Sequence, residues 1–265
     1  MGSAPVQAPL VVIVGETASG KSALAMELAS AFGGEIICAD SRTVYKGADI
    51  GTAKPSIEER TKVTHHLLDV VRPDELFTAA DFKRLALETT RDISDRGKLP
   101  IMVGGSGLYV DSVLYDYQFS QPGAERDERN PRHLKKVSET SRHTLRPNTL
   151  IIGLQVDREV LERRIVHRVE GMFDMGLLQE VRSLADKYGW LSPGLQAIGY
   201  KELKPVLGSE QSIEDATQLM IRNTKAYAKR QRTWFKRNKS IHWISDPAKA
   251  KSLVQNFLSN HPVTS

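Results

Sequence analysis

The residues best suited to chemistry form one short run, GETASGKS at positions 15–22. Its spacing, G-x-x-x-x-G-K-S, is typical of a phosphate-binding loop (P-loop), because an apolar run at 10–14 precedes it and apolar residues at helical spacing follow it. The glycines let backbone N–H groups fold around an anion, and the start of a helix adds a positive dipole end. Lys21 contributes a flexible cation and Ser22 a hydroxyl for Mg²⁺. The run therefore predicts a site for a diphosphate or triphosphate.

Two further polar residues follow predicted strands. Asp40 comes after the β-prone run EIICA at 35–39, and Ser106 lies in GGSG after the strand-like LPIMV at 99–103. Because ligands gather at the carboxyl ends of parallel strands, Asp40 is expected beside the mouth of the P-loop. The glycines around Ser106 permit close backbone approach, so its hydroxyl can reach a phosphate oxygen. Both residue types are also common in ordinary turns, so the pattern alone leaves a structural role open.

The predicted strand at 99–103 lacks a feature of phosphate-hydrolysing P-loop proteins. Such proteins use a second carboxylate at a strand end to hold Mg²⁺, and a further residue to orient the attacking water. Here the strand ends in Gly-Gly-Ser. The bound phosphates are therefore predicted to act as a leaving group rather than to donate a γ-phosphate.

Basic residues are the remaining candidate ligands. Arg164 and Arg168 lie one helical turn apart, and they either converge on an anion or form a solvated face. Residues 216–245 carry eight Lys and Arg and no acid. Their spacing along one predicted helix favours contact with a nucleic-acid backbone over a plain solvated surface. The stripe consists of Arg222, Lys225, Lys229, Arg232 and Lys236.

Strand patterns alternate with helix patterns along the chain, which predicts an α/β fold with a parallel sheet and helices on both faces. Strands are expected at 10–14, 35–39, 99–103 and 149–156, with further candidates at 65–71 and 241–244. Helices are expected after the P-loop and after Thr78, Asp157 and Ser212. The segment 117–148 is charged and contains several prolines, and it is predicted to lie outside this core.

Composition bounds the class of protein. A chain of 265 residues with 40% hydrophobic residues can bury one substantial core. Cys38 is the single cysteine, so neither a disulfide framework nor a cysteine-rich zinc site is available. No apolar run approaches the roughly 18 residues of a membrane span, and the N-terminus lacks a secretory pattern. We expect a cytoplasmic protein without a membrane partner.

Several motifs in order resemble the tRNA dimethylallyltransferases, also called tRNA isopentenyltransferases. They are GETASGKS, ADSRTVYKGADIGTAKP, HHLLDVV, FTAADF, VGGSGLYVDSVL, RIVHRVEGMFDMGLLQEV, QAIGYKEL and NTKAYAKRQRTWFKRN. The resemblance implies transfer of a dimethylallyl group from dimethylallyl diphosphate to N6 of adenosine 37, beside the tRNA anticodon, with Mg²⁺ and release of diphosphate. It also implies a P-loop NTPase-like core at 1–116 and 149–265 and a reduced helical insert at 117–148 that contacts tRNA. A monomer is expected.

The resemblance also implies roles for individual residues. Asp40 looks like the general base that accepts the N6 proton, and Arg168 would neutralise the departing diphosphate. The catalytic residues implied are Asp40, Ser106, Lys21 and Arg168. Those implied for the diphosphate are Gly15, Thr17, Ala18, Ser19, Gly20, Lys21, Ser22 and Arg164, with Ser22 also binding Mg²⁺. Those implied for the tRNA anticodon stem-loop are Asp40, Ser41, Arg42, Thr43, Ser106, Arg129, Arg222, Lys229 and Arg232.

The chain departs from the family pattern at several places. Glu16 replaces the proline usual after the first P-loop glycine, and Thr43 stands where glutamine is frequent. Ser106 replaces a threonine and keeps the hydroxyl. The helical insert that normally lies between residues similar to Arg129 and Asn130 is nearly absent. No cysteine/histidine zinc finger follows the core, which favours the bacterial type.

Three other functions are compatible with parts of this pattern. Adenylate isopentenyltransferases share the P-loop and the base but act on free AMP, ADP or ATP. A non-catalytic RNA-binding relative would keep the basic stripe without the reaction, and a small-molecule kinase would use the P-loop alone. The basic stripe and the IGYKE motif favour the tRNA branch.

Overall fold

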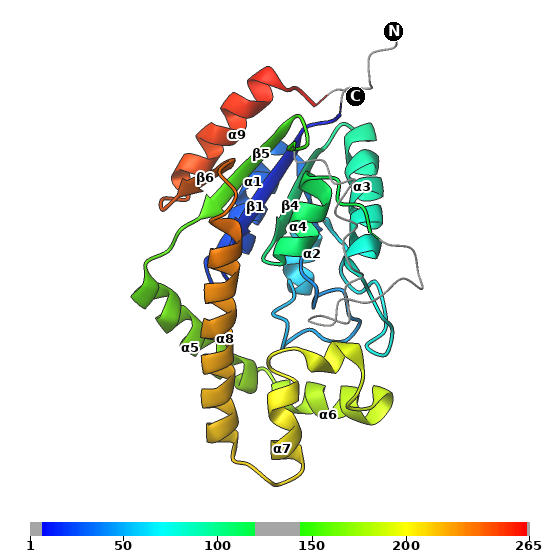
Figure 1. The fold of residues 1–265 in the computed structure, drawn as a ribbon, viewed down its shortest axis with the longest axis vertical. Coiled ribbons are helices and arrows are strands. Elements are labelled where there is room, and N and C mark those ends of the chain that lie inside the picture. Colours follow the sequence, from blue (N-terminus) through cyan, green and yellow to red (C-terminus); the bar gives the residue numbers. More distant parts are fainter. Residues whose placement is uncertain (1–6, 120–143, 264–265) are drawn as a thin grey trace.

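The computed structural model describes residues 7–119 and 144–263. Six parallel strands form one sheet in the order β3-β2-β4-β1-β5-β6, so the predicted parallel sheet is confirmed. The strand that leads into the P-loop lies near the middle of the sheet (Figure 1). The strands are β1 (Leu10–Gly15), β2 (Gly34–Cys38), β3 (His65–His66), β4 (Leu99–Gly104), β5 (Thr149–Leu154) and β6 (Ile241–Ile244).

Both faces of the sheet are covered by helices, as predicted. Side chains alternate along a strand, so Val11 and Ile13 pack with one set of helices while Val12 and Val14 pack with the other. The first set is α1 (Lys21–Phe32) and α9 (Ala248–Asn260). The second set includes α3 (Ala79–Asp95), α4 (Gly107–Leu114) and α8 (Ile213–Phe235). Because both faces of the sheet are buried, β1 and β4 are apolar along almost their whole length.

A group of helices lies beyond the carboxyl ends of the strands, in the lower part of Figure 1. It comprises α5 (Arg158–Asp174), α6 (Leu177–Tyr188), α7 (Lys204–Leu207), the 3₁₀ turns Pro193–Gln196 and Lys201–Leu203, and the start of α8. Asp157 caps α5 by accepting the N–H groups of Glu159 and Val160. The buried face of α5 is the predicted one, Leu161, Ile165, Val169 and Met172. This leaves the next face of α5, with Arg164 and Arg168, turned toward the P-loop.

The predicted caps of two further helices are confirmed. The hydroxyl of Thr78 accepts a hydrogen bond from the Asp81 N–H, and the Asp81 carboxylate accepts one from the Thr78 N–H. Ser212 accepts the N–H of Asp215 at the start of α8. Both helices therefore begin directly after the predicted capping residues.

The segment 65–71 was predicted as a strand, but only β3 pairs with the sheet. Leu67 and Asp69 have φ of 61° and 55°, in the left-handed region that strands exclude. The Asp69 carboxylate is held by Lys54 from the preceding loop and by Arg60 from the helix at Ile57–Lys62, which fixes this turn. The strand prediction is therefore wrong beyond His66.

Several helices were not expected from the sequence, among them α2 (Ile57–Lys62), α4, α7 and α9. The short α2 begins at Ser56, which forms a capping box with Glu59. Helix α9 packs Ala250 and Val254 against the sheet after β6. Most of the predicted insert, residues 120–143, lies outside the described residues. Within the described ranges, no helix is both long enough and apolar enough to span a membrane.

Candidate active site

The P-loop opens into a hollow of about 470 Å³, here called the P-loop hollow. Ala18 and Gly20 have left-handed φ of 62° and 95°, and this backbone turns the loop into the start of α1. Loop residues that line the hollow are Thr17, Ala18, Gly20, Lys21 and Ser22. Asp40, Arg164 and Arg168 line the same hollow from β2 and α5. The structure thus brings together the acid, the two arginines and the phosphate loop that the sequence singled out separately.

Not every predicted loop residue faces the hollow. Gly15 and Ser19 lie behind it; a Cβ on Gly15 would come within 2.9 Å of the Ser19 hydroxyl. The Ser19 hydroxyl is buried without a hydrogen-bond partner among the described residues. The N–H of Thr17 donates to Gln231 Oε1 at 2.8 Å, and that of Ser19 donates to the Glu16 carbonyl at 3.2 Å. These two N–H groups are therefore taken by the protein, whereas Ala18 and Gly20 line the hollow.

Lys21 is half-buried and lines the hollow. Its Nζ donates to the backbone carbonyl of Glu16 at 3.2 Å. Burial and the nearby Arg168 guanidinium lower the pKa of Lys21 to about 8, although the charges of Asp40 and Glu16 oppose the shift. A bound phosphate would raise this pKa again, because a nearby negative charge favours the protonated lysine.

Arg164 and Arg168 both reach the P-loop, at different depths. Arg168 Nη1 donates to the Thr17 hydroxyl at 3.2 Å, and burial lowers the pKa of Arg168 while the Asp40 charge opposes that shift. Arg164 is more exposed, and its Nη1 is 3.4 Å from the Ser19 carbonyl. The two guanidinium groups therefore converge on one anion site, with Arg168 as the inner group.

Asp40 and Ser106 are joined through the turn that follows β2. Asp40 Oδ1 accepts the N–H of Arg42 at 2.8 Å, and the Ser106 hydroxyl accepts the N–H of Ser41 at 3.0 Å. Ser106 N–H in turn donates to the Ala39 carbonyl. The turn after β2 and the turn after β4 thus form one hydrogen-bonded unit. One Asp40 carboxylate oxygen, Oδ2, has no hydrogen bond of this unit and is available to a substrate.

A second hollow of about 350 Å³ lies on the other side of this unit; we call it the Trp234 hollow. Asp40 and Gly104 line the P-loop hollow, whereas the next residues of both turns line the Trp234 hollow. Its lining includes five aromatic residues, Tyr45, Phe77, Tyr109, Tyr227 and Trp234, beside polar side chains such as Ser106, Arg230 and Gln231. Aromatic walls with a few polar groups suit a flat, unstacked base. The turn after β2 therefore borders both hollows, with Asp40 in the P-loop hollow and the next residue, Ser41, in the Trp234 hollow.

The glycines around Ser106 are there because other groups approach them closely. A Cβ on Gly104 would lie 2.0 Å from the Ala39 carbonyl oxygen, and one on Gly105 would lie 2.1 Å from Gln231 Nε2. A Cβ on Gly107 would enter the Trp234 ring at 2.3 Å. The GGSG run is thus the contact surface of β4 with β2 and α8, which places Ser106 beside Asp40.

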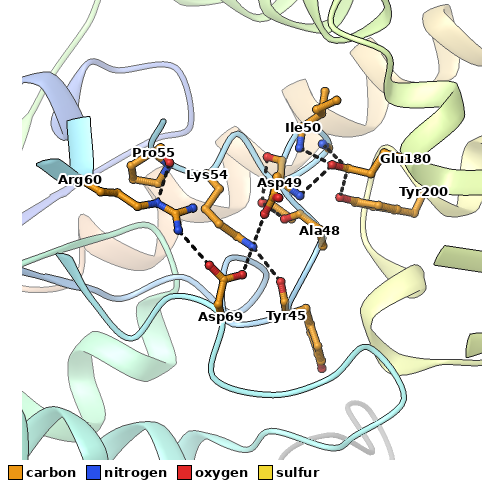
Figure 2. A network of polar contacts seen from close by, with 12 residues as sticks. Tyr45, Ala48, Asp49, Ile50, Lys54, Pro55, Arg60, Asp69, Glu180 and Tyr200 are labelled. Carbon is orange, nitrogen blue, oxygen red and sulfur yellow. Dashed lines mark hydrogen bonds and ion pairs between the residues drawn. The ribbon is translucent and has the colours of Figure 1, made fainter. Parts of the chain in front are cut away.

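A polar network fixes the loop that contains Asp49, Ile50 and Lys54 (Figure 2). Glu180 on α6 accepts three consecutive backbone N–H groups, those of Asp49, Ile50 and Gly51, at 2.7 to 3.0 Å. Its carboxylate also accepts the Tyr200 hydroxyl at 2.6 Å. Thr52, Ala53 and Pro55, the residues that follow, line the hollow. Glu180 therefore holds one wall of the site.

The predicted basic stripe on α8 divides into two groups. Arg222, Lys229 and Lys236 are exposed, and the ion pairs among the described residues do not include them. Lys225 and Arg232 face acids: Lys225 Nζ is 2.8 Å from Glu162, and Arg232 is bonded to Glu16. Only part of the stripe is therefore open to a polyanion.

The other predicted tRNA contacts fall in different places. Ser41, Arg42 and Ser106 line the Trp234 hollow, whereas Thr43 lines the P-loop hollow with a buried, unpartnered hydroxyl. Thr43 thus lies on the phosphate side rather than on the aromatic side. Arg129 lies outside the described residues.

The sequence reasoning missed Gln231, Tyr227 and Glu180. Gln231 is 4% exposed, and its amide bridges the Thr17 N–H and the Gly105 carbonyl. Its position four residues after Tyr227, on the apolar face of α8, was the available signal, because a polar residue there must be hydrogen-bonded. No local signal pointed to Glu180, since the backbone N–H groups that it accepts lie about 130 residues away in the sequence.

The parallel sheet, the phosphate loop at its carboxyl edge and the aromatic hollow beside it define a P-loop class protein with a second, base-sized site. The profile of the IPP transferase family matches residues 43–147 and 126–238. The tRNA dimethylallyltransferase of Staphylococcus aureus (strain bovine RF122 / ET3-1) is 38% identical over 285 aligned positions, covering 89% of this chain and 92% of the relative. The chain belongs to the IPP transferase family.

Solved structures agree with this assignment. A tRNA delta(2)-isopentenylpyrophosphate transferase from Staphylococcus epidermidis is 34% identical with a TM-score of 0.82, covering 96% of this chain and 100% of that chain. A eukaryotic dimethylallyltransferase captured acting on tRNA is 27% identical with a TM-score of 0.84, covering 98% and 81%. The alignment with the Staphylococcus aureus relative counts more positions than this chain has residues, so that relative carries residues that are missing here.

Proposed function

We propose that the protein transfers a dimethylallyl group from dimethylallyl diphosphate to N6 of adenosine 37 in tRNA. The observation that carries this proposal is the position of Asp40 in the P-loop hollow, directly before Ser41, which lines the Trp234 hollow. The diphosphate suits the side with Lys21, Arg164 and Arg168, and a flipped adenine suits the aromatic side. The family membership supports the same assignment.

The reaction requires a nucleophile, a base and charge stabilisation on the leaving group. The N6 nitrogen attacks C1 of the dimethylallyl group, the C1–O bond breaks, and the diphosphate leaves with its electron pair. Asp40 accepts the proton released from N6, because it lines the P-loop hollow at the turn whose next residue, Ser41, lines the Trp234 hollow. Lys21, Arg168 and the N–H groups of Ala18 and Gly20 neutralise the charge that develops on the diphosphate.

Water must be kept away from the allylic carbon while its bond to oxygen breaks. A base stacked in the Trp234 hollow would close that side, and the loop held by Glu180 closes part of the other. Ser106 is tied to the Ser41 N–H, so it positions the turn that bears Asp40 and presents its oxygen to the base side.

The site suits a Mg²⁺ ion that binds together with the diphosphate of the substrate. Among the residues that the structure describes, no cluster of three or more His, Cys, Asp or Glu could hold a metal by itself. Mg²⁺ commonly takes one or two protein ligands and completes its shell with substrate phosphates and water. Ser22 lines the P-loop hollow and would hold the ion there, where it adds charge compensation for the diphosphate.

The acceptor can be tested with dimethylallyl diphosphate labelled in its hydrocarbon part. The label is offered to an anticodon stem-loop with adenosine at positions 36 to 38, and in parallel to AMP and ATP. We expect label on the stem-loop alone, lost when position 37 is guanosine, which has no N6 amine. Label on AMP or ATP alone would assign the protein to cytokinin-type synthesis, and label on none of them would contradict the proposal.

Glu180 is predicted to control the activity from outside the site. Glu180→Ala removes the acceptor of three backbone N–H groups, so the wall formed by Thr52 and Ala53 loses its position. A displaced wall misplaces the donor, and kcat/KM for dimethylallyl diphosphate should fall about 10²-fold. Tyr200→Phe, which loses a single hydrogen bond to the same carboxylate, is the matched control and should cost less than about threefold. Equal, small effects of both variants would contradict this role.

The pH dependence should report Lys21. The pKa of Lys21 is about 8 in the free protein, so its positive charge is present below that pH and is lost above it. We expect kcat/KM for dimethylallyl diphosphate to fall as the pH rises through about 8, measured at saturating stem-loop. Lys21→Arg keeps the charge across this range, so its lower activity should lack the alkaline decline. An identical decline in both proteins would assign the titration to another group.

A further inference from the structure

The P-loop of this chain contains an acid next to its first glycine. Glu16 lies between Gly15 and Thr17, and its side chain is 8% exposed. A buried carboxylate beside an anion site raises the free energy of the bound anion, and an unpaired one is costly in itself. Something must therefore compensate for Glu16 if the loop is to hold a diphosphate.

Arg232 on α8 supplies the compensation. Its Nε and Nη2 both donate to Glu16 Oε1, at 3.0 and 2.8 Å. The two residues are 216 positions apart in the sequence, so the pair joins the P-loop to the helix that carries the basic stripe. The two N–H donors of Arg232 compensate the negative charge of Glu16 on the side that faces α8. Glu16 itself does not line the P-loop hollow.

The neighbouring residue reinforces this connection. Gln231 Oε1 accepts the Thr17 N–H at 2.8 Å, and Gln231 Nε2 donates to the Gly105 carbonyl at 3.0 Å. Two consecutive residues of α8 thus hold two consecutive residues of the P-loop. Because Gln231 also bonds Gly105, the turn that contains Ser106 is joined to α8 by the same side chain.

We propose that Arg232 is a positioning residue that neutralises Glu16 and fastens the P-loop to α8, and that it is not a contact for the tRNA backbone. This inference rests on the proposed binding of a diphosphate by the P-loop. The exposed Lys229 on the same helix serves as the comparison, because the structure gives it no ion pair among the described residues.

The test measures two affinities separately for Arg232→Ala. Inorganic diphosphate with Mg²⁺, titrated by calorimetry, reports the loop without any transfer reaction, and stem-loop binding at several salt concentrations reports the tRNA surface. We expect the diphosphate Kd and the KM for dimethylallyl diphosphate to rise about tenfold, with kcat changed less than about threefold. The salt slope of stem-loop binding should stay as in the unmodified protein, whereas Lys229→Ala should reduce that slope by about 1.

A second change provides the decisive comparison. In Glu16→Gln/Arg232→Ala the unpaired carboxylate is gone, so diphosphate affinity should return to within about threefold of the unmodified protein. This double variant also keeps the test valid if Arg232→Ala alone folds poorly, since it leaves no buried charge without a partner.

The inference is overturned if Arg232→Ala lowers the salt slope and leaves the diphosphate affinity unchanged, or if Glu16→Gln brings no recovery. Failure of the proposed function gives a different result. In that case the unmodified protein itself binds no diphosphate or transfers no label.

Discussion

Asp40→Asn is expected to slow dimethylallyl transfer to the stem-loop by about 10³-fold, the usual scale for losing a general base at a reacting nitrogen. Asparagine keeps the shape, and its carbonyl oxygen can still accept the Arg42 N–H that Asp40 Oδ1 accepts now. It cannot take a proton from N6. The loss should therefore appear in single-turnover rates, while stem-loop and diphosphate affinities stay within about threefold.

Ser41→Ala is the control for this result. It lies in the same turn, and the Ser41 backbone N–H, which makes the bond to Ser106, is retained. Its transfer rate should stay within about fivefold of the unmodified protein. If Asp40→Asn transfers at a rate within tenfold of the unmodified protein, the carboxylate is not the base and the mechanism above is wrong.

Arg168→Gln is expected to have the second largest effect, a loss of about 10²-fold in kcat/KM for dimethylallyl diphosphate. Arg168 is the inner of the two arginines, half-buried beside Thr17 and within the influence of the Asp40 charge. Charge compensation is worth most where water is excluded. The loss should fall on kcat as well as on KM, because the diphosphate gains charge as the C1–O bond breaks.

Arg164→Gln is the matched comparison on the same helix. Arg164 is exposed, and its contact with the Ser19 carbonyl is long at 3.4 Å. Its loss should cost about tenfold, mostly in KM. Larger damage from Arg164→Gln than from Arg168→Gln would reverse the assignment of the inner phosphate ligand.

The parts of this molecule that could be predicted from sequence have their partners nearby in the chain. The P-loop, the Thr78 capping box and the buried face of α5 depend on spacings of three to eight residues, which the sequence displays directly. The position of Asp40 beside the P-loop also followed, because parallel strands share a carboxyl edge.

The contacts that could not be predicted join distant segments. Periodicity grouped Arg232 with Lys229 in one basic stripe, yet the fold places Glu16 against Arg232 and leaves Lys229 exposed. Glu180 gave no local sign that it would accept the N–H groups of residues 49–51. Such pairings depend on how α6 and α8 dock on the sheet, and a single sequence holds no record of that docking.

The strand predicted at 65–71 failed for a related reason. Its apolar residues suggested a strand, but Leu67 and Asp69 take left-handed backbone conformations, and Lys54 and the α2 residue Arg60 hold the Asp69 carboxylate in place. A tertiary contact thus overrides the local preference. A tertiary contact also changes the role expected of Thr17, since its N–H donates to Gln231 and not to a phosphate.

The central claim, that two substrates reach Asp40 from opposite hollows, is tested most directly by a crystal structure of the ternary complex. The complex would contain Mg²⁺, the unreactive analogue dimethylallyl thiodiphosphate, and a stem-loop with adenosine at position 37. We predict the diphosphate against Lys21 and Arg168, the flipped adenine against Tyr227 and Trp234, and its N6 within about 3 Å of the Asp40 carboxylate. An adenine bound elsewhere, or on the P-loop side of Asp40, would contradict the account.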